Sequence, residues 1–246
     1  MEIRKKRKII VCNPNTSTSM TDALKPLVDA LGFDTTLFEY FTAPSGVSSI
    51  NNEDDAAVSA EACLPDLKSK LHEVDGFLIC CYSQHPLVHQ LRRELAERNL
   101  TGKAVTGIFE ASVATCIQSI NPHDRFGIVS TGKQWEEILA EAVTELLGSE
   151  APNRYAGTET TGLNADELHS TPAHEVNKRM KAATKRLLGK EAKAICLGCA
   201  GMAGMDVTVR EACIEQLGKA EGERIKIIDG VVSGTCFLEG ALRAGL

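Results

Sequence analysis

The chain has 246 residues, of which 43% are hydrophobic and 24% are charged, and its formal net charge at neutral pH is −6. A chain of this length can bury a substantial core, in one domain or in two small ones. The acidic balance argues against binding to a nucleic-acid backbone, and no apolar run approaches the ~20 residues of a membrane-spanning helix. We therefore expect a cytoplasmic protein with neither a nucleic-acid nor a membrane partner.

A basic cluster, Arg4–Lys8, lies at the N-terminus. In an acidic chain, such a short cluster favours a solvated tail over a nuclear or nucleic-acid signal. The apolar run after it, Ile9–Cys12, is shorter than the ~7–15 residues of a secretory signal. This is consistent with a cytoplasmic location.

Short apolar runs alternate with amphipathic stretches along the chain. The runs predict strands at Lys8–Cys12, Asp34–Tyr40, Gly76–Cys81, Ala104–Ile108, Phe126–Ser130, Ala194–Leu197 and Ile225–Ile228. The stretches predict helices at Thr21–Leu31, Asp54–Leu71, Leu87–Glu97, Trp135–Leu147, Ala173–Leu188 and Val207–Leu217. Several strands are apolar at nearly every position, which is typical of parallel strands buried on both faces. The pattern predicts an α/β fold with right-handed crossovers.

Five residues mark expected helix ends. Ser19 is a candidate N-cap, Pro86 sets the start of a helix, and Asp206 can cap another. Gly148 and Gly189 fall where helix C-caps are expected.

A repeat relates the two halves of the chain. The segments IIVCNP, starting at Ile9, and GIVSTG, starting at Gly127, lie 118 residues apart, and so do Cys81 and Cys199. The shared offset predicts two similar halves, each with a strand that ends in a cysteine. Ligands of open α/β sheets bind beyond the carboxyl ends of the strands, so two facing halves would line one cleft. We expect the two cysteines to approach a ligand from opposite sides.

Strand alternation separates Cys81 from its neighbour Cys80. Successive side chains point to opposite faces, so at most one of the two readily faces a given ligand. The offset aligns Cys80 with Gly198, which has no side chain, and Cys81 with Cys199. We therefore expect Cys80 in the core and Cys81 in the site. A helix follows each site cysteine, and its N-terminus should lower the thiol pKa.

Two opposed thiols can move a proton from one face of a carbon to the other. One, as a thiolate, removes the proton, and the other, as a thiol, delivers one to the opposite face, which inverts a stereocentre without a metal or cofactor. The developing enolate needs hydrogen-bond donors. Candidate loops at strand ends are Asn13–Ser17, Pro44–Ile50 and Ser130–Gly132. Each of them taken alone is an ordinary turn or helix cap.

The nine cysteines do not suggest a disulfide framework, because their number is odd and several lie inside apolar segments. Cys196 and Cys199 have C-x-x-C spacing, but no second pair completes a zinc site. We expect no metal. A redox pair or redox sensor remains an alternative.

Several motifs, in order, resemble the hydantoin racemase family, which includes allantoin racemases and relatives associated with nitrogen catabolism and belongs to the aspartate/glutamate racemase superfamily. They are NPNTS-x-x-MT from Asn13, PSGVSSI from Pro44, GI-x-EA from Gly107, LGCAGMA from Leu197 and IDGV from Ile228. The resemblance implies two pseudo-symmetric α/β domains with open parallel sheets and the active site in the cleft between them. It also implies cofactor-independent racemisation of allantoin or a 5-substituted hydantoin by two cysteines.

On this resemblance, the catalytic positions are Cys81 and Cys199, and no cofactor is expected. The resemblance further places near the ligand Asn13, Ser17, Ser48, Ile50, Thr131 and Gly201. It implies that the chain returns to its first domain, which gives domains of residues 1–103 plus 225–246 and of residues 104–224. We also expect a small-molecule substrate and a homo-oligomer.

The loop after Cys81 departs from the family pattern. Relatives commonly have a small, acidic loop with glycine and proline, whereas this chain has Tyr82–Pro86, YSQHP. Tyr82 and His85 are therefore further candidates for substrate binding, although His85 can equally be a first-turn helix residue. This loop is where substrate preference should differ.

Related activities remain as alternatives. Similar folds use cysteines to isomerise maleate or to decarboxylate arylmalonates, and a non-catalytic small-molecule binder could share the fold. Cysteines at both positions argue against a one-thiol decarboxylase and against a binder, which needs neither.

Overall fold

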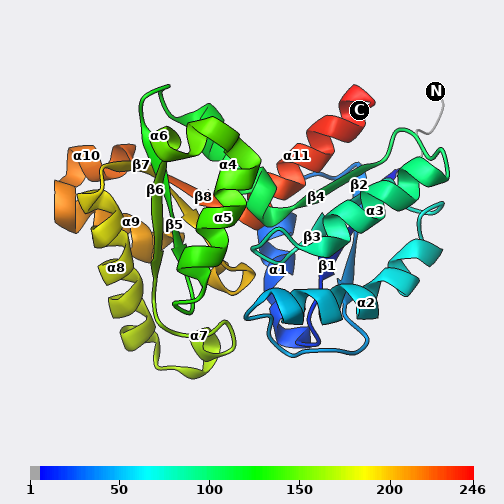
Figure 1. Ribbon diagram of the computed structural model, residues 1–246, viewed down its shortest axis with the longest axis horizontal. Coiled ribbons are helices and arrows are strands. Elements are labelled where there is room, and N and C mark those ends of the chain that lie inside the picture. Colours follow the sequence, from blue (N-terminus) through cyan, green and yellow to red (C-terminus); the bar gives the residue numbers. More distant parts are fainter. Residues whose placement is uncertain (1–5) are drawn as a thin grey trace.

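A computed structural model describes residues 6–246, apart from the side chain of His169. Arg4 and Lys5 of the basic cluster lie outside the described residues. Two lobes lie side by side, each built on one parallel sheet with helices on both faces (Figure 1). This confirms the predicted fold class. Among the helices of residues 6–246, none is long and apolar enough to cross a membrane.

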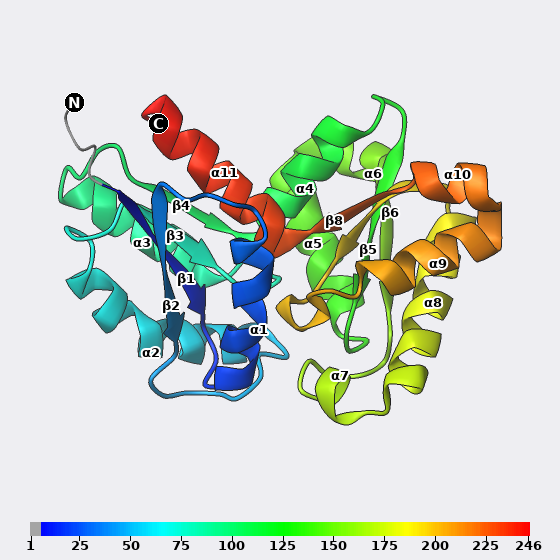
Figure 2. The same ribbon diagram turned by 180° about the vertical axis from the view of Figure 1, so that it is seen from behind.

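The first lobe contains a sheet in the order β2-β1-β3-β4, with every neighbouring pair parallel. Its strands are β1 (Arg7–Asn13), β2 (Thr36–Thr42), β3 (Gly76–Ile79) and β4 (Ala104–Gly107). Its helices are α1 (Thr18–Asp29), α2 (Glu53–Ser69), α3 (Pro86–Glu97) and the C-terminal α11 (Gly230–Ala244), which contacts α1, as the view from behind also shows (Figure 2).

The second lobe repeats this arrangement in the order β6-β5-β7-β8, again all parallel. Its strands are β5 (Arg125–Ser130), β6 (Tyr155–Thr160), β7 (Ala192–Leu197) and β8 (Lys226–Asp229). Its helices are α4 (Ile108–Ser119), α5 (Trp135–Leu147), η1 (Gly148–Glu150), α6 (Ala151–Arg154), α7 (Glu167–Ser170), α8 (Ala173–Gly189), η2 (Ala200–Met202), α9 (Asp206–Leu217) and α10 (Lys219–Arg224). The matching strand order confirms two similar halves.

The fourth strand of each sheet lies on the other side of the expected boundaries. β4 pairs with β3 in the first sheet, although the boundary at residues 103 and 104 assigns it to the second unit. β8 pairs with β7 in the second sheet, although the expected boundary at residues 224 and 225 assigns it to the first unit. Each sheet therefore completes its fourth strand before the chain crosses, and the crossing segments are α4 and α11.

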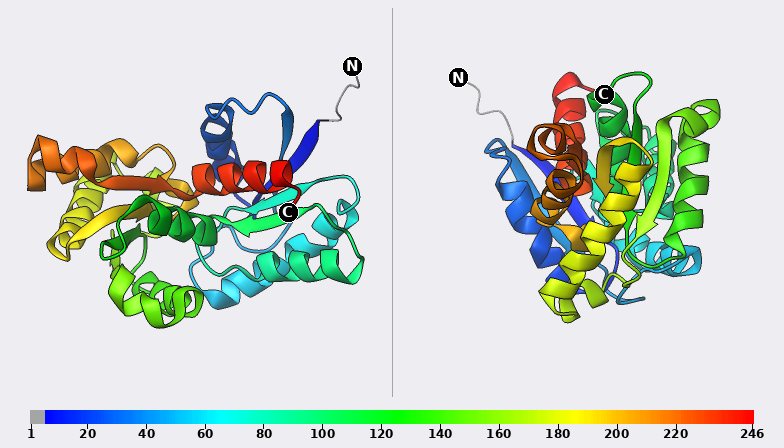
Figure 3. Two further views of the ribbon diagram at one scale, coloured as in Figure 1. Left: turned by 90° about the horizontal axis from the view of Figure 1, so that it is seen from above. Right: turned by 90° about the vertical axis from the view of Figure 1, so that its left-hand side faces the viewer.

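The junction of the lobes is formed by these two crossing helices, which pack against each other. β8 and α11 run in line across it (Figure 3). Gly230 begins α11, and a Cβ at this position would lie 2.8 Å from the carbonyl oxygen of Ile108. The close approach of the two helices therefore requires a glycine there.

One apolar core extends through the junction. It joins Ile9 and Leu78 of the first sheet to Ile128 and Cys196 of the second, with Phe109 of α4 between them. Because the two sheets share this core, α4 fixes the position of one lobe against the other.

The helix ends differ in detail from those expected. The N-cap of α1 is Ser17 rather than Ser19, and Met205 precedes α9, so Asp206 is its first residue. Pro86 begins α3 and Gly148 is the C-cap of α5, as predicted, whereas Gly189 is the last residue of α8.

Candidate active site

The carboxyl ends of the central strands place the two site cysteines in corresponding positions. The amide of Cys80 donates to Cys12 O (2.8 Å) beyond β3, and the amide of Gly198 donates to Val129 O (2.7 Å) beyond β7. Each bond extends the strand pairing by one residue, and the next residue is Cys81 in the first lobe and Cys199 in the second. Cys80 is 3% exposed in the core, which confirms its predicted role, whereas Cys81 is partly exposed.

Cys81 lies in a desolvated position beside three polar groups. Burial raises the pKa of its thiol to about 12, a hydrogen bond with Ser83 opposes this rise, and negative charge on Cys199 and Glu110 adds to it. The Sγ of Cys81 is 3.5 Å from the Oγ of Ser83. The two thiols are thus close enough to influence each other's charge.

Cys199 caps the short helix η2. The amide of Gly201 donates to its Sγ over 3.3 Å. Burial raises the pKa of this thiol to about 11, and the backbone amides of Gly201 and Met202 oppose the rise. The expectation that helix N-termini hold these thiols below their ordinary pKa is therefore wrong: desolvation outweighs the amide hydrogen bonds, and both thiols are protonated at neutral pH.

Glu110 lies in the first turn of α4, close to Cys81. Burial raises its carboxyl pKa, and its Oε2 is buried with no hydrogen-bond partner within residues 6–246. A Cβ at Gly107 would collide with this oxygen. The carboxyl group is therefore held over the end of β4, on the same side of the sheet as Cys81.

Asn13 and Ser17 organise the loop after β1. The Asn13 amide group is 2% exposed and donates to Asn15 Oδ1 and to Ser17 O, each over 2.9 Å. Ser17 caps α1, and α1 contacts η2 across the cleft. The structure thus brings the loop to the Cys199 side of the cleft, where Asn13 fixes the loop conformation and Ser17 is half-buried.

Tyr82 points away from the cleft. Its ring is 4% exposed, packs edge-on against Phe109 at 5.7 Å, and places its hydroxyl 2.7 Å from Ser112 Oγ. A direct role in substrate binding does not agree with this position. The reason is strand alternation, since Tyr82 lies on the opposite face from Cys81.

His85 is the N-cap of α3 and is fully buried. Its Nδ1 accepts from the amide of Leu87 (3.4 Å), and its Nε2 is 3.3 Å from Ser59 Oγ, which donates to Pro14 O. Both ring nitrogens are occupied, and burial lowers the imidazole pKa to about 4, so His85 is neutral. It links the Cys81 loop to the loop after β1, and both of its ring nitrogens are engaged by protein groups.

The remaining candidates lie on the loops that border the cleft. Ile50 is 7% exposed and Ser48 is exposed. Thr131 is 2% exposed, and its hydroxyl makes no hydrogen bond within the described part of the chain. The Nε2 of Gln134 donates to Asn51 O (3.1 Å) and so joins the border loops of the two lobes.

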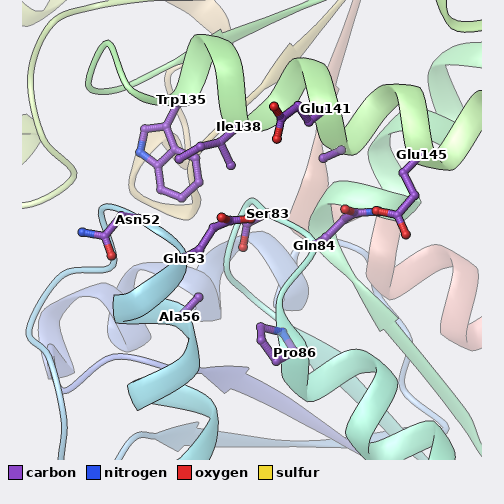
Figure 4. Close-up of a pocket in the computed structure, with 11 residues that line it drawn as sticks. Asn52, Glu53, Ala56, Ser83, Gln84, Pro86, Trp135, Ile138, Glu141 and Glu145 are labelled. Atoms are coloured by element: carbon purple, nitrogen blue, oxygen red, sulfur yellow. The ribbon is translucent and has the colours of Figure 1, made fainter.

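A cavity of about 160 Å³ lies between the lobes (Figure 4). Its first-lobe wall comes from the N-terminal end of α2 and from the loop before α3, including Asn52, Glu53, Ser83 and Gln84. α5 supplies the second-lobe wall, including Trp135, Glu141 and Glu145. Ser83 thus belongs to this cavity and also contacts Cys81.

Ser83, Glu110 and Gln134 have no individual role in the prediction from the sequence. Ser83 could have been found, because it is two residues after Cys81 and so shares its face in extended chain. Glu110 lies within the quoted GI-x-EA motif, but only the fold brings it beside Cys81. No group of three or more His, Cys, Asp or Glu side chains that could hold a metal occurs in the described residues.

Comparisons with known proteins agree with this geometry. The sequence model of the family described as Asp/Glu/Hydantoin racemase matches residues 9–235. An uncharacterised protein of Schizosaccharomyces pombe, C1F7.10, is 33% identical over 97% of this chain and 93% of its own length. A hydantoin racemase of Pseudomonas sp. is 27% identical over 97% of this chain and 87% of its own. The structure of allantoin racemase from Klebsiella pneumoniae is 26% identical, with a TM-score of 0.79 over 98% of this chain and 89% of that one.

Proposed function

The chain belongs to the Asp/Glu/hydantoin racemase family, and we propose that it is a cofactor-independent racemase that inverts the C5 stereocentre of allantoin or of a 5-substituted hydantoin. The observation that best supports this activity is the pair of thiols, Cys81 and Cys199, at corresponding strand ends of two similar halves. Each is close enough to affect the other's charge. Both are partly exposed.

The reaction is a proton transfer at one carbon. The Cys81 thiolate takes the C5 proton of one enantiomer and becomes a thiol, and the electron pair is delocalised onto the C4 carbonyl oxygen as an enolate. The Cys199 thiol gives its proton to the opposite face of C5 and becomes a thiolate. The other enantiomer reacts with the roles exchanged.

Hydrogen bonds in the site stabilise each thiolate when it forms. Ser83 donates to the Sγ of Cys81, and the amide of Gly201 donates to the Sγ of Cys199. Because burial raises both pKa values, the thiolate is scarce at neutral pH and correspondingly basic when present. Basicity suits the removal of a weakly acidic C–H proton.

The enolate oxygen needs donors that are in place before the reaction. The Thr131 hydroxyl has no partner among residues 6–246 and is a candidate for this role. His85 and Asn13 act as positioning residues, because they fix the Cys81 loop and the loop after β1.

Named relatives support a hydantoin-type substrate. The Pseudomonas relative is named a hydantoin racemase, and the Klebsiella structure is named an allantoin racemase. Both substrates carry an acidic C–H between a ring carbonyl and a ring nitrogen, which is the chemistry that two opposed thiols can perform. A one-thiol decarboxylase or a non-catalytic binder does not require the second cysteine.

Racemisation with isotope exchange tests the proposal. The protein is incubated in D₂O with (S)-allantoin and, separately, with (S)-5-benzylhydantoin, with protein-free samples as the background. We expect two changes to occur together. The optical rotation of the sample should decay, and deuterium should be incorporated at C5, as observed by NMR. Cys81→Ser and Cys199→Ser should each abolish racemisation, because inversion needs both faces of C5.

Cys236→Ser is the matched control. This thiol is exposed on α11 outside the candidate site, so the variant should racemise at the rate of the unmodified protein. Racemisation that persists in either site variant contradicts the two-thiol mechanism. No racemisation of either compound by the unmodified protein contradicts the proposed activity.

A further inference from the structure

The cavity between the lobes has a lining that suggests a particular class of substrate. We infer that it holds the C5 substituent and favours substituents with an alkyl stem and a positively charged end. The inference rests on the proposed function and concerns the substrate class of the same site. It follows from where the cavity lies, what forms its walls and which charges surround it.

The position of the cavity suits a group attached to C5. Ser83 is 3.5 Å from the Sγ of Cys81 and also lines the cavity. A carbon close enough to Cys81 to lose its proton can therefore extend a substituent past Ser83. The volume of about 160 Å³ is roughly ten times what one water needs, so a chain of several heavy atoms fits.

One wall is apolar and aromatic. Trp135, Ile138 and Ala142 are spaced so that they lie on the same face of α5, and all three line the cavity. Trp135 is only 5% exposed, which fixes its indole ring in place. Figure 4 shows the Trp135 and Ile138 side chains on the α5 side of the space, opposite Asn52 and Ser83. Such a wall suits an alkyl stem and, at its aromatic part, a nearby cation.

The charges around the cavity are all negative. Glu53, Glu141 and Glu145 line it, and no lysine, arginine or histidine is among its lining residues. Within residues 6–246 none of the three forms an ion pair, whereas other glutamates, such as Glu159 and Glu215, are paired with two cations each. The cavity therefore has a net negative field that attracts a cation and repels a carboxylate.

A pair of near-isosteric ligands measures this preference. In 5-(4-aminobutyl)hydantoin and 5-pentylhydantoin, an ammonium group and a methyl group occupy the same end of the substituent. Exposed carboxylates attract a cation weakly, and three of them acting together should favour the ammonium compound about tenfold in both Kd and kcat/KM at low salt. The ratio should fall at 0.5 M NaCl because the carboxylates are exposed to solvent.

The test compares the two compounds by calorimetric Kd and by racemisation, in the unmodified protein and two variants. In Glu141→Gln/Glu145→Gln the ammonium-to-pentyl ratio should fall to about twofold. Glu137→Gln is the control, because Glu137 is exposed on the same helix but does not line the cavity, and it should keep the tenfold ratio.

Equal Kd values for the two compounds, or a ratio that is unchanged in the double variant, overturn the inference. The outcome for the proposed function is separate. If the protein binds the ammonium compound preferentially but racemises neither, the cavity assignment holds and the proposed activity is wrong. If it racemises both without preference, the activity holds and the cavity assignment is wrong.

Discussion

Removing the Ser83 hydroxyl should make Cys81 a weaker acid. Ser83→Ala deletes the hydrogen bond between the Ser83 Oγ and the Cys81 Sγ, which are 3.5 Å apart. It leaves the amide hydrogen bond to Cys199 in place. Hydrogen bonds to charged groups contribute about 1.5–3 kcal/mol, and this one is long and involves sulfur, so we take the lower limit. This corresponds to a rise of about one pKa unit.

The measurement is alkylation by iodoacetamide at pH 8.5, followed by site-resolved mass spectrometry. Because only the thiolate reacts, Cys81 should react about tenfold more slowly in Ser83→Ala than in the unmodified protein. Cys199 serves as the internal standard, since Ser83 does not affect its pKa. Ser69→Ala, an exposed serine on α2, is the matched control and should leave both rates unchanged.

Racemisation should follow the same change. The kcat/KM for a hydantoin should fall about tenfold in Ser83→Ala, and the loss should be partly recovered at higher pH, because more thiolate forms there. An unchanged ratio of Cys81 to Cys199 alkylation would refute the assignment of Ser83 as the group that stabilises the Cys81 thiolate. A pH-independent loss of racemisation would instead indicate a general disturbance of the loop.

Two further predictions concern stability. In Gly198→Ala the new Cβ would lie 2.6 Å from Ile128 Cγ2 and 2.7 Å from Val129 O. This overpacking should lower the free energy of unfolding, measured in urea, by about 1–3 kcal/mol. Gly189→Ala is the control: a Cβ there meets nothing within 4 Å, so the substitution should be neutral or stabilising. An unfolding midpoint unaffected by Gly198→Ala would contradict the close packing at β5. The free energy of unfolding should also fall in alkali. Thiols in the unfolded chain ionise at pH ~8.5, whereas burial raises the pKa values of Cys199 and Cys81 to about 11 and about 12. The stability that the two protonated thiols contribute is therefore fully present below pH ~8.5 and is lost as the pH rises towards these values. Between pH 8 and 10.5, in the presence of a reductant, Cys81→Ala/Cys199→Ala should therefore lose less unfolding free energy than the unmodified protein. The difference should reach about 1.4 kcal/mol per pH unit for each thiol. Equal losses in the two proteins would contradict the raised pKa values.

The strand pattern could be predicted because parallel strands buried on both faces are apolar throughout. β6 was missed because Tyr155–Thr160 is polar and forms an edge strand that is buried only at alternate residues. The crossing helices α4 and α11 were missed for the opposite reason. Their sequences are apolar and rich in small residues, since they pack between the two lobes and lack a broad polar face.

At the site, the sequence predicts which residues repeat but not what surrounds them. The offset identifies Cys81 and Cys199, and alternation places Cys80 in the core. The same alternation excludes Tyr82, which was nevertheless predicted as a ligand contact. Glu110 is 29 residues from Cys81 in the sequence, and the pairing of β4 with β3 brings the start of α4 beside Cys81.

Glu110 should act on Cys81 in the opposite sense to Ser83. Its negative charge raises the pKa of Cys81, and its Oε2 is buried without a partner among residues 6–246. Glu110→Gln preserves the shape and removes the charge, so the Cys81 pKa should fall. Alkylation of Cys81 at pH 8.5 should become faster, while Cys199, whose pKa Glu110 does not affect, keeps its rate.

The kinetic consequence of Glu110→Gln is a shift of the whole pH profile and not a preference for one enantiomer. Two hydantoin enantiomers have equal free energies in water, so the kcat/KM values for the two directions must be equal in any variant. With a lower Cys81 pKa, kcat/KM therefore begins to rise at a pH closer to neutrality. This shift in pH is the same whichever enantiomer is the substrate. Slower Cys81 alkylation in Glu110→Gln, or a pH profile that does not move, would show that the carboxylate does not act on the thiol by its charge.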